Sequence, residues 1–233
     1  MTEAQAAPPE RPGAGLGLVR DLLRVHAARS DVRRMVVVGN APLEPDPERV
    51  AAIDSADLVL RCNSFMLDRP GDPPTQGSAV HGVCFSRGLL ATDFSWQRYR
   101  DLAYLVTEPS RIYAQANLAR YVKDWPAWWP EDLGFVAVPN HAFTVPLLEA
   151  LEVPWRDEVV VPTTGLMAVH IAMSCFPDAE LWITGFSMID NPHQTEWKHH
   201  AGDVSPIGGA HLIEPESRLF RRWIDEGRVR QLP

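Results

Sequence analysis

The stretch Met35-Val-Val-Val-Gly-Asn40 is rich in β-branched residues and ends in Gly-Asn. Such a run is typical of a buried parallel strand that leads into a tight turn. A helix is expected next, at residues 47–53, because Asp46 is a suitable N-cap and Pro47 suits the first helical position. Residues 57–61 then predict a second strand, so this part of the chain has the order strand, helix, strand.

The same alternation continues along the rest of the chain. Further strands are predicted at residues 80–85, 102–106, 135–138 and 181–184, and helices at 16–28, 114–123, 145–151, 165–175 and 214–226. Val229 is a candidate for a last edge strand, and the proline-broken stretches 67–76 and 125–130 are expected to be loops. This order predicts an α/β fold: a single Rossmann-like domain at residues 16–233, with a mostly parallel sheet flanked by helices, after a disordered tail at residues 1–15.

The composition narrows the class of protein. The chain has 233 residues and a formal net charge of −8, and no stripe of Lys and Arg is present to neutralise phosphates, which argues against a nucleic-acid partner. Its three cysteines, Cys62, Cys84 and Cys175, form no C-x-x-C pair, which argues against a zinc site or a disulfide framework. No apolar run approaches the ~20 residues of a membrane span, and a secretory signal is not recognisable, so a cytoplasmic location is expected.

Small and polar residues follow three of the predicted strands at the point where each strand ends. They are Gly39-Asn40, Cys62-Asn63 and Gly185-Phe186-Ser187. In parallel sheets ligands bind in the crevice at the carboxyl ends of the strands, so we expect these residues to be neighbours. Glycine permits close approach of a ligand and asparagine both donates and accepts hydrogen bonds, although an ordinary turn or cap explains each residue as well. The sequence after the first strand is not G-x-G-x-x-G, which disfavours a dinucleotide site.

Pro162-Thr-Thr-Gly165 stands at the start of the predicted helix 165–175. Backbone N–H groups and hydroxyls at the positive end of a helix can hold an anion or a nucleobase. A plain N-cap by Thr163 or Thr164 explains the same residues. The segment is therefore a candidate phosphate cradle at a place where a structural cap is also expected.

Three histidines lie in the C-terminal third of the chain. His199 and His200 are adjacent, and His211 opens an H-x-x-x-x-E element that ends at Glu216. Histidine can act as a general base near neutral pH and can donate to a phosphate. A lone histidine at a helix entrance, or a glutamate in a first turn, also has a structural explanation. The acidic residues nearby have no spacing that resembles a metal-binding motif, so no metal site is expected.

Taken together, these segments resemble the sialyltransferase family that includes the animal Golgi enzymes, glycosyltransferase family 29. The large motif of the family resembles Val36-Val-Val-Gly-Asn40 through Asp57-Leu-Val-Leu-Arg-Cys-Asn63, with the two donor-binding asparagines at Asn40 and Asn63. The small motif resembles Pro162-Thr-Thr-Gly165 through Leu181-Trp-Ile-Thr-Gly-Phe186. The third motif resembles His199-His-Ala-Gly-Asp203, and the very small motif resembles His211 to Glu216.

The chain departs from the family pattern at several positions. Asn40-Ala-Pro-Leu lacks the second glycine that the family usually has here, and Ala201-Gly202 replace aromatic residues of the third motif. Met35 stands where the first cysteine of the animal enzymes' disulfide would be, so that bond is expected to be absent. The chain is also short and without the membrane anchor and stem, so the resemblance is to a soluble, bacterial-type member.

The resemblance implies an inverting, metal-independent transfer of an acidic sugar from a CMP-activated donor, such as CMP-sialic acid, to a hydroxyl of a glycan or small-molecule acceptor. It also implies a GT-A-like variant of the fold and no cofactor, because the CMP-sugar is a substrate. His211 would be the general base and His200 would donate to the departing phosphate, with His199 as the alternative. Gly39 and Glu216 would support these groups. The residues implied to hold the donor nucleotide are Asn40, Asn63, Thr163, Thr164, Gly165, Gly185 and Ser187.

Two other functions are consistent with the same residues. The first is a transferase that uses another CMP-sugar, of the Kdo type or another nonulosonic acid, in natural-product or surface-glycan assembly. The second is a non-catalytic CMP-binding protein. His200 and His211 argue against the second function, because a protein that only binds has no need of a base.

Overall fold

The computed structural model describes residues 14–86, 92–94, 101–107 and 136–233. A sheet of seven strands forms its centre, in the order β5-β4-β3-β2-β1-β6-β9, and its neighbouring strands are all parallel. The strands are β1 (Arg34–Val38), β2 (Leu58–Cys62), β3 (Gly82–Phe85), β4 (Ala103–Val106), β5 (Val136–Ala137), β6 (Glu180–Thr184) and β9 (Arg230–Gln231). The predicted α/β class with a mostly parallel sheet is confirmed.

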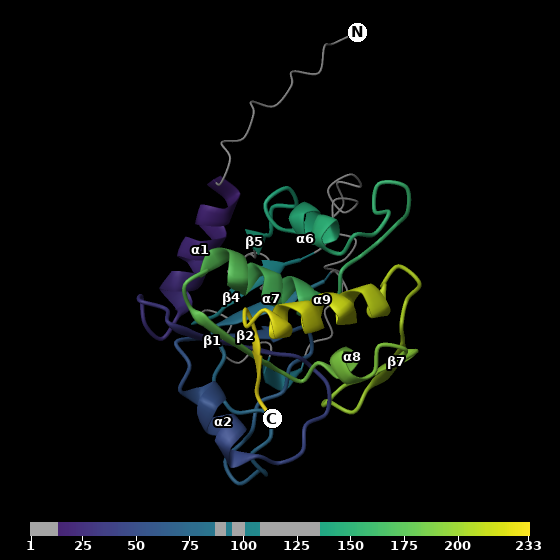
Figure 1. Cartoon of the computed structure of the whole chain (residues 1–233). Coiled ribbons are helices and arrows are strands. Elements are labelled where there is room, and N and C mark those ends of the chain that lie inside the picture. Colours follow the sequence, from purple (N-terminus) through teal and green to yellow (C-terminus); the bar gives the residue numbers. More distant parts are fainter. Residues whose placement is uncertain (1–13, 87–91, 95–100, 108–135) are drawn as a thin grey trace.

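Helices cover both faces of this sheet. They are α1 (Ala14–His26), α2 (Pro47–Asp54), α6 (Thr144–Ala150), α7 (Thr164–Cys175), α8 (Ser187–Asp190) and α9 (Ile213–Asp225). Figure 1 shows α1, α7 and α9 on one side and α2 on the other. None of these helices, within the part of the chain that the structure describes, is long and apolar enough to cross a membrane.

Alternation along β1 explains this layering. Met35 and Val37 belong to the core under α1, α7 and α9, whereas Val36 and Val38 pack with Ile53 of α2. All four strand residues are at most 1% exposed, as expected for a central parallel strand that is covered on both faces. The β-branched run at residues 35–38 therefore forms an interior strand of the sheet, with a paired strand on each side.

The position of β1 creates the place where a ligand can bind. β1 pairs with β2 on one side and with β6 on the other, although β6 follows far later in the chain. The strand order therefore changes direction between β1 and β6. In open α/β sheets, ligands bind at such a switch point, outside the carboxyl ends of the strands.

The structure refines several of the predicted elements and adds others. Asp46 caps α2 by accepting hydrogen bonds from the backbone N–H groups of Glu48 and Arg49, as predicted. Short helix α8 and the antiparallel hairpin of β7 (Glu196–Lys198) and β8 (Val204–Pro206) were not predicted. The predicted helix 114–123 and loop 125–130 lie outside the described residues, as does most of the expected tail.

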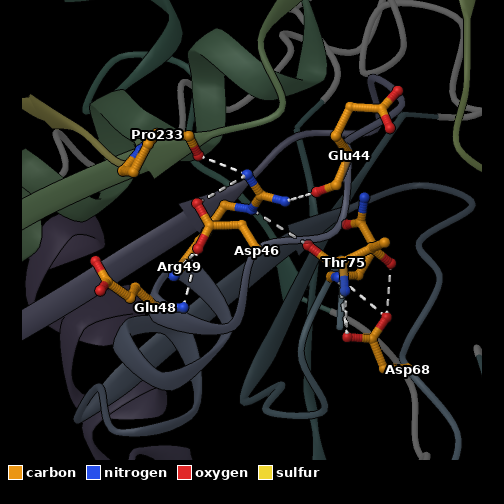
Figure 2. A network of polar contacts seen from close by, with 8 residues as sticks. Glu44, Asp46, Glu48, Arg49, Asp68, Thr75 and Pro233 are labelled. Atoms are coloured by element: carbon orange, nitrogen blue, oxygen red, sulfur yellow. Dashed lines mark hydrogen bonds and ion pairs between the residues drawn. The ribbon is translucent and has the colours of Figure 1, made fainter. Parts of the chain in front are cut away.

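A buried arginine holds the end of the chain against the α2 side of the sheet. Arg49 is 4% exposed and donates to the backbone oxygens of Pro233 at 2.7 Å, Thr75 at 3.3 Å and Glu44. Asp68 in turn accepts from the Thr75 hydroxyl and backbone N–H, each at 2.8 Å. Figure 2 shows the Arg49 guanidinium between Glu44, Thr75 and Pro233. These hydrogen bonds fix the three segments relative to one another.

Candidate functional site

A cavity of about 480 Å³ opens at the carboxyl ends of β1, β2 and β6. The amino end of α7 and the segment that enters α9 complete its wall. It is lined by most of the predicted site residues: Gly39, Asn40, Asn63, Thr163, Thr164, Gly165, Gly185, Ser187, His199 and His211. His200 and Glu216, the two remaining predicted residues, do not line it.

Two glycines let the ends of β1 and β6 approach closely. A Cβ atom on Gly39 would lie 2.2 Å from the carbonyl oxygen of Gly185, and Gly185 itself has a φ of +76°. Only glycine adopts such a backbone angle without strain. The contact is fixed by hydrogen bonds from Gly39 N–H to Thr184 O and from Ala41 N–H to Gly185 O. We call this part of the cavity wall, which Gly39 and Gly185 form, the floor of the cavity. It consists of backbone without side chains.

The two asparagines connect neighbouring strand ends. Asn40 donates through Nδ2 to the carbonyl oxygen of Cys62 at 2.8 Å, which leaves its side-chain oxygen as an acceptor. Asn63 has a φ of +42° and accepts at Oδ1 from the Ser86 backbone N–H at 3.1 Å. Its Nδ2 lies 3.4 Å from the Thr164 hydroxyl oxygen. Both asparagines thus have a structural function in addition to a place in the cavity wall.

The Thr-Thr-Gly turn begins α7. Thr163 is the N-cap, and its hydroxyl oxygen accepts from the Leu166 backbone N–H at 3.3 Å. Gly165 leaves room for Phe186, whose ring carbon would be 2.7 Å from a Cβ atom at that position. The N-cap by Thr163 is confirmed, and the same residues also line the cavity, so the phosphate cradle stays a prediction.

The carboxyl group of Glu216 is hydrogen-bonded to Thr163 of this turn. It is fully buried in the first turn of α9 and bonds both the backbone N–H of Thr163, at 3.0 Å, and its hydroxyl oxygen, at 2.6 Å. Burial raises the pKa of the Glu216 carboxyl to about 8, although the two hydrogen bonds from Thr163 act in the opposite direction. The partner of this glutamate is thus the helix cap of α7.

His211 lines the cavity and has a defined tautomer. Its Nδ1 atom is 2.7 Å from the carbonyl oxygen of Val161. A carbonyl oxygen can only accept, so Nδ1 carries a proton. In the neutral ring the lone pair is then on Nε2, which is the arrangement that a general base needs.

The two adjacent histidines occupy different environments. His199 lines the cavity, and its Nδ1 is 2.6 Å from Oδ2 of Asp203, which fixes the orientation of the ring. His200 instead donates its backbone N–H to the carbonyl oxygen of Asn40, and its Nε2 is 3.4 Å from the Thr75 hydroxyl. Burial lowers the pKa of the His200 imidazole, with the charge of Asp68 acting against the shift.

Of the cavity residues that were missed in the sequence, three belong to one hairpin. Trp197, Lys198 and Ser205 come from the β7–β8 hairpin, in which Trp197 is aligned with Ser205. Trp197 is partly buried and also packs against the main core. Because each hairpin strand has only three residues, no alternation of apolar and polar residues is long enough to reveal it.

The charge of the cavity differs from that of the whole chain. The net charge of the chain is −8, yet no aspartate or glutamate is among the described residues that line the cavity. Lys198, His199 and His211 are the lining side chains that can carry positive charge. No group of three or more His, Cys, Asp or Glu residues in the described ranges could hold a metal ion. The cavity therefore suits an anion.

Similarity to known proteins is found at the level of the fold. No family model matches the chain, and no curated protein matches it. The structure of a mammalian sialyltransferase aligns with a TM-score of 0.56 and 15% sequence identity, over 98% of this chain and 81% of that chain. The structure of a mammalian sialyltransferase in complex with Gal-beta-1-3GalNAc-ortho-nitrophenol aligns with a TM-score of 0.54 and 16% identity, over 96% of this chain and 81% of that chain. The chain thus has the Rossmann-like fold that these sialyltransferases have.

Proposed function

We propose that this protein is an inverting glycosyltransferase that moves an acidic sugar from a CMP-activated donor, such as CMP-sialic acid, to an acceptor hydroxyl. The observation that carries the proposal is the cavity itself, which unites residues of all four motifs and has no carboxylate in its described wall. A nucleoside monophosphate leaving group is an anion, and such a wall favours it. The shared fold with sialyltransferases supports the same function.

His211 would act as the general base. Its Nδ1 proton is held by Val161, so Nε2 would take the proton of the acceptor hydroxyl as that oxygen attacks the sugar. The bond from the anomeric carbon to the CMP phosphate breaks as the new glycosidic bond forms. A correctly placed base of this kind contributes roughly 10²–10⁴-fold in rate.

A second histidine would donate to the phosphate as negative charge develops on it. The resemblance favours His200, whereas His199 is the one that lines the cavity, with Asp203 behind it. We therefore assign the phosphate contact to His199 and a supporting function to His200, through its bond to the Asn40 carbonyl. His199→Ala should lower kcat at least tenfold more than His200→Ala, since hydrogen bonds to a developing charge are worth ~2.7–4 kcal/mol.

The remaining residues would hold the nucleotide, and no metal ion would be required. The backbone N–H groups at the start of α7 offer donors to a phosphate. The Thr163 hydroxyl would face the same phosphate, and the Oδ1 atom of Asn40 and the hydroxyls of Thr164 and Ser187 would bind the rest of the nucleotide. The donor set supports binding without a metal, because the described wall offers cations and neutral donors in place of carboxylates.

Calorimetric titration with CMP, UDP and GDP in the presence of a chelator tests the nucleotide. Selective binding of CMP is expected, and binding of another nucleotide in preference to CMP would refute the proposal. Hydrolysis of CMP-sialic acid by the wild type, by His211→Ala and by the control His141→Ala then tests the base. His141 is exposed and lies outside the cavity, so its replacement should leave turnover intact.

Donor screening separates the remaining possibilities. Turnover with a Kdo-type or other nonulosonic CMP-sugar, but not with CMP-sialic acid, would change the sugar and keep the mechanism. CMP binding without turnover of any CMP-sugar, unchanged in His211→Ala, would leave a non-catalytic CMP-binding protein.

A further inference from the structure

The contact between Glu216 and Thr163 joins a buried acid directly to the wall of the cavity. Glu216 is 0% exposed, and Thr163 is both the N-cap of α7 and a lining residue. Within the described residues, the carboxyl group of Glu216 makes hydrogen bonds only to Thr163 and forms no ion pair. The state of this acid can therefore act on a ligand through Thr163 alone.

The hydroxyl of Thr163 can make three hydrogen bonds, one as donor and two as acceptor. One acceptor position is taken by the Leu166 N–H at 3.3 Å. The 2.6 Å contact with Oε2 of Glu216 can then be made in two ways. If Glu216 is ionised, the threonine must donate its proton to the carboxylate, and a lone pair remains for the cavity. If Glu216 is protonated, the acid donates to the threonine, and the threonine O–H remains for the cavity.

These two states are opposite for an anionic ligand. An O–H group that points to a phosphate oxygen makes a charge-assisted hydrogen bond, whereas a lone pair at the same position repels it. The N–H of Thr163 donates to Oε1 of Glu216 in both states, so the backbone of the turn does not have to move. A single proton on Glu216 thus decides whether Thr163 can donate to a ligand.

The surroundings of Glu216 favour the protonated state. Desolvation by burial is the largest influence on its pKa and raises it to about 8. Charged and titratable side chains on the neighbouring elements bond elsewhere: Glu214 pairs with Arg218, Arg221 donates to Ile189 O, and His211 bonds Val161 O. His170 of α7 and Asp190 of α8 form no hydrogen bond or ion pair with Glu216 either. No neighbouring cation among the described residues compensates a negative charge on this glutamate.

We propose that Glu216 is a positioning residue that remains protonated and thereby turns the Thr163 hydroxyl into a donor for the phosphate of the bound nucleotide. The inference rests on the proposed function for the identity of that ligand. Loss of the Glu216 proton reverses the hydrogen bond, because Thr163 then donates to the carboxylate. The ligand in turn loses a donor and meets a lone pair.

The test is the pH dependence of CMP binding, measured by calorimetry from pH 6.5 to pH 9. Glu216→Gln imitates the protonated acid at every pH, because its amide oxygen can accept from the Thr163 N–H and its NH₂ group can donate to the hydroxyl. The wild type should lose affinity with rising pH by about tenfold more than this variant, since a hydrogen bond to a charged group is worth ~1.5–3 kcal/mol. Any pH dependence that does not come from Glu216 is common to both proteins and cancels in the comparison.

A second pair of variants does not depend on the folding of Glu216→Gln. Thr163→Ser keeps the hydroxyl and should retain the alkaline loss of affinity, whereas Thr163→Val removes the hydroxyl and should abolish it. In the Thr163→Val background, Glu216→Gln should no longer change the pH profile, which is the coupling expected of two residues that act through one contact.

The outcomes separate this inference from the proposed function. Parallel pH profiles of the wild type and Glu216→Gln, or a retained alkaline loss in Thr163→Val, would overturn the positioning function while CMP binding stands. Failure of the wild type to bind CMP at any pH would instead overturn the proposed function. Infrared difference spectra of the wild type and Glu216→Gln at pH 7 should show the carbonyl band of a protonated carboxyl group, and absence of that band would also overturn the inference.

Discussion

Single residues at the floor of the cavity have little freedom to change. Gly39 and Gly185 bring two backbones together without side chains between them. Because a ligand at a sheet switch point lies against this floor, the glycines determine the depth of the cavity. Substitution here should affect stability and binding at the same time.

Gly39→Ala should destabilise the protein and abolish CMP binding. The added Cβ atom would be 2.2 Å from the Gly185 carbonyl oxygen, and overpacking of this kind costs about 1–3 kcal/mol or more. Gly17→Ala is the matched control, because nothing lies within 4 Å of a Cβ atom at that helical position. It should be neutral or stabilise by up to ~1 kcal/mol. Urea unfolding of both variants checks the difference, and equal stability of the two would contradict it.

His170 should make the protein less stable in acid. Burial, and then the charge of Arg228, lower the pKa of its imidazole to about 4 in the folded protein. The unfolded chain therefore binds a proton that the folded chain does not, and stability should fall as the pH drops from about 6.5 towards 4. The full effect is on the order of 3 kcal/mol.

Urea unfolding at pH 7 and pH 5 measures this effect. His170→Phe keeps the ring that stacks on Trp223 and meets Phe143 edge-on, and it should reduce the loss of stability in acid. His193→Gln, at an exposed position, should not. Glu216 contributes in the opposite direction, because its pKa is raised on folding, so the comparison with the wild type isolates His170. An unchanged acid slope in His170→Phe would show that this histidine is not responsible.

At the scale of elements, the β7–β8 hairpin forms one wall of the cavity. Trp197 presents an aromatic ring there, and His199 follows directly after β7. Stacking of a nucleobase or contact with a sugar face is the natural use of such a ring. Under the proposed function, the hairpin would therefore contribute both contact area and, through His199, a donor to the phosphate.

Trp197→Ala should weaken CMP binding by roughly tenfold or more, since stacking of a base on an aromatic side chain is worth ~1–3 kcal/mol. Trp197→Phe keeps an aromatic face and should retain most of the affinity. Tight binding by Trp197→Ala would mean that the ring serves only to pack the hairpin on the core. Circular dichroism of the variants controls for loss of the fold.

The elements also indicate how far sequence reasoning reaches. The strand at Met35 and the cap at Thr163 could be predicted because their signals are local: β-branched residues in a run, and a hydroxyl before an apolar helix. Helix α8 has four residues, which is shorter than any periodicity can reveal. His199 and His200 lie in the turn of a hairpin that the sequence did not reveal, so their different surroundings could not be predicted.

Hydrogen bonds between side chains that are far apart in the sequence could not be predicted either. Glu216 was expected to support its own helix or His211, and it bonds Thr163, which lies 53 residues earlier in the chain. The sequence pointed to the right segments for the cavity wall, because strand ends of a parallel sheet meet at one edge. It could not specify which side chains of those segments bond one another.

At the scale of the whole molecule, the cavity wall is drawn from segments that extend from Gly39 to His211. A ligand that touches all of them should stabilise the entire domain. CMP at one hundred times its dissociation constant contributes about 2.7 kcal/mol, which corresponds to a rise in Tm of roughly 5–10 °C for a domain of this size. Thermal unfolding with CMP and with UMP measures this, and an equal shift with both nucleotides would contradict selective recognition of cytidine.

The pairing of β1 on both of its sides has a consequence for folding during synthesis on the ribosome. Met35 pairs with Leu58 on one side and with Leu181 on the other. A nascent chain can form the first pairing early, but the opposite edge of β1 stays open until the sixth strand has been synthesised. An open, apolar strand edge can pair with another chain, and contacts between distant residues form slowly. Slower synthesis, or chaperones that cover that edge, should therefore raise the yield of soluble protein during recombinant expression.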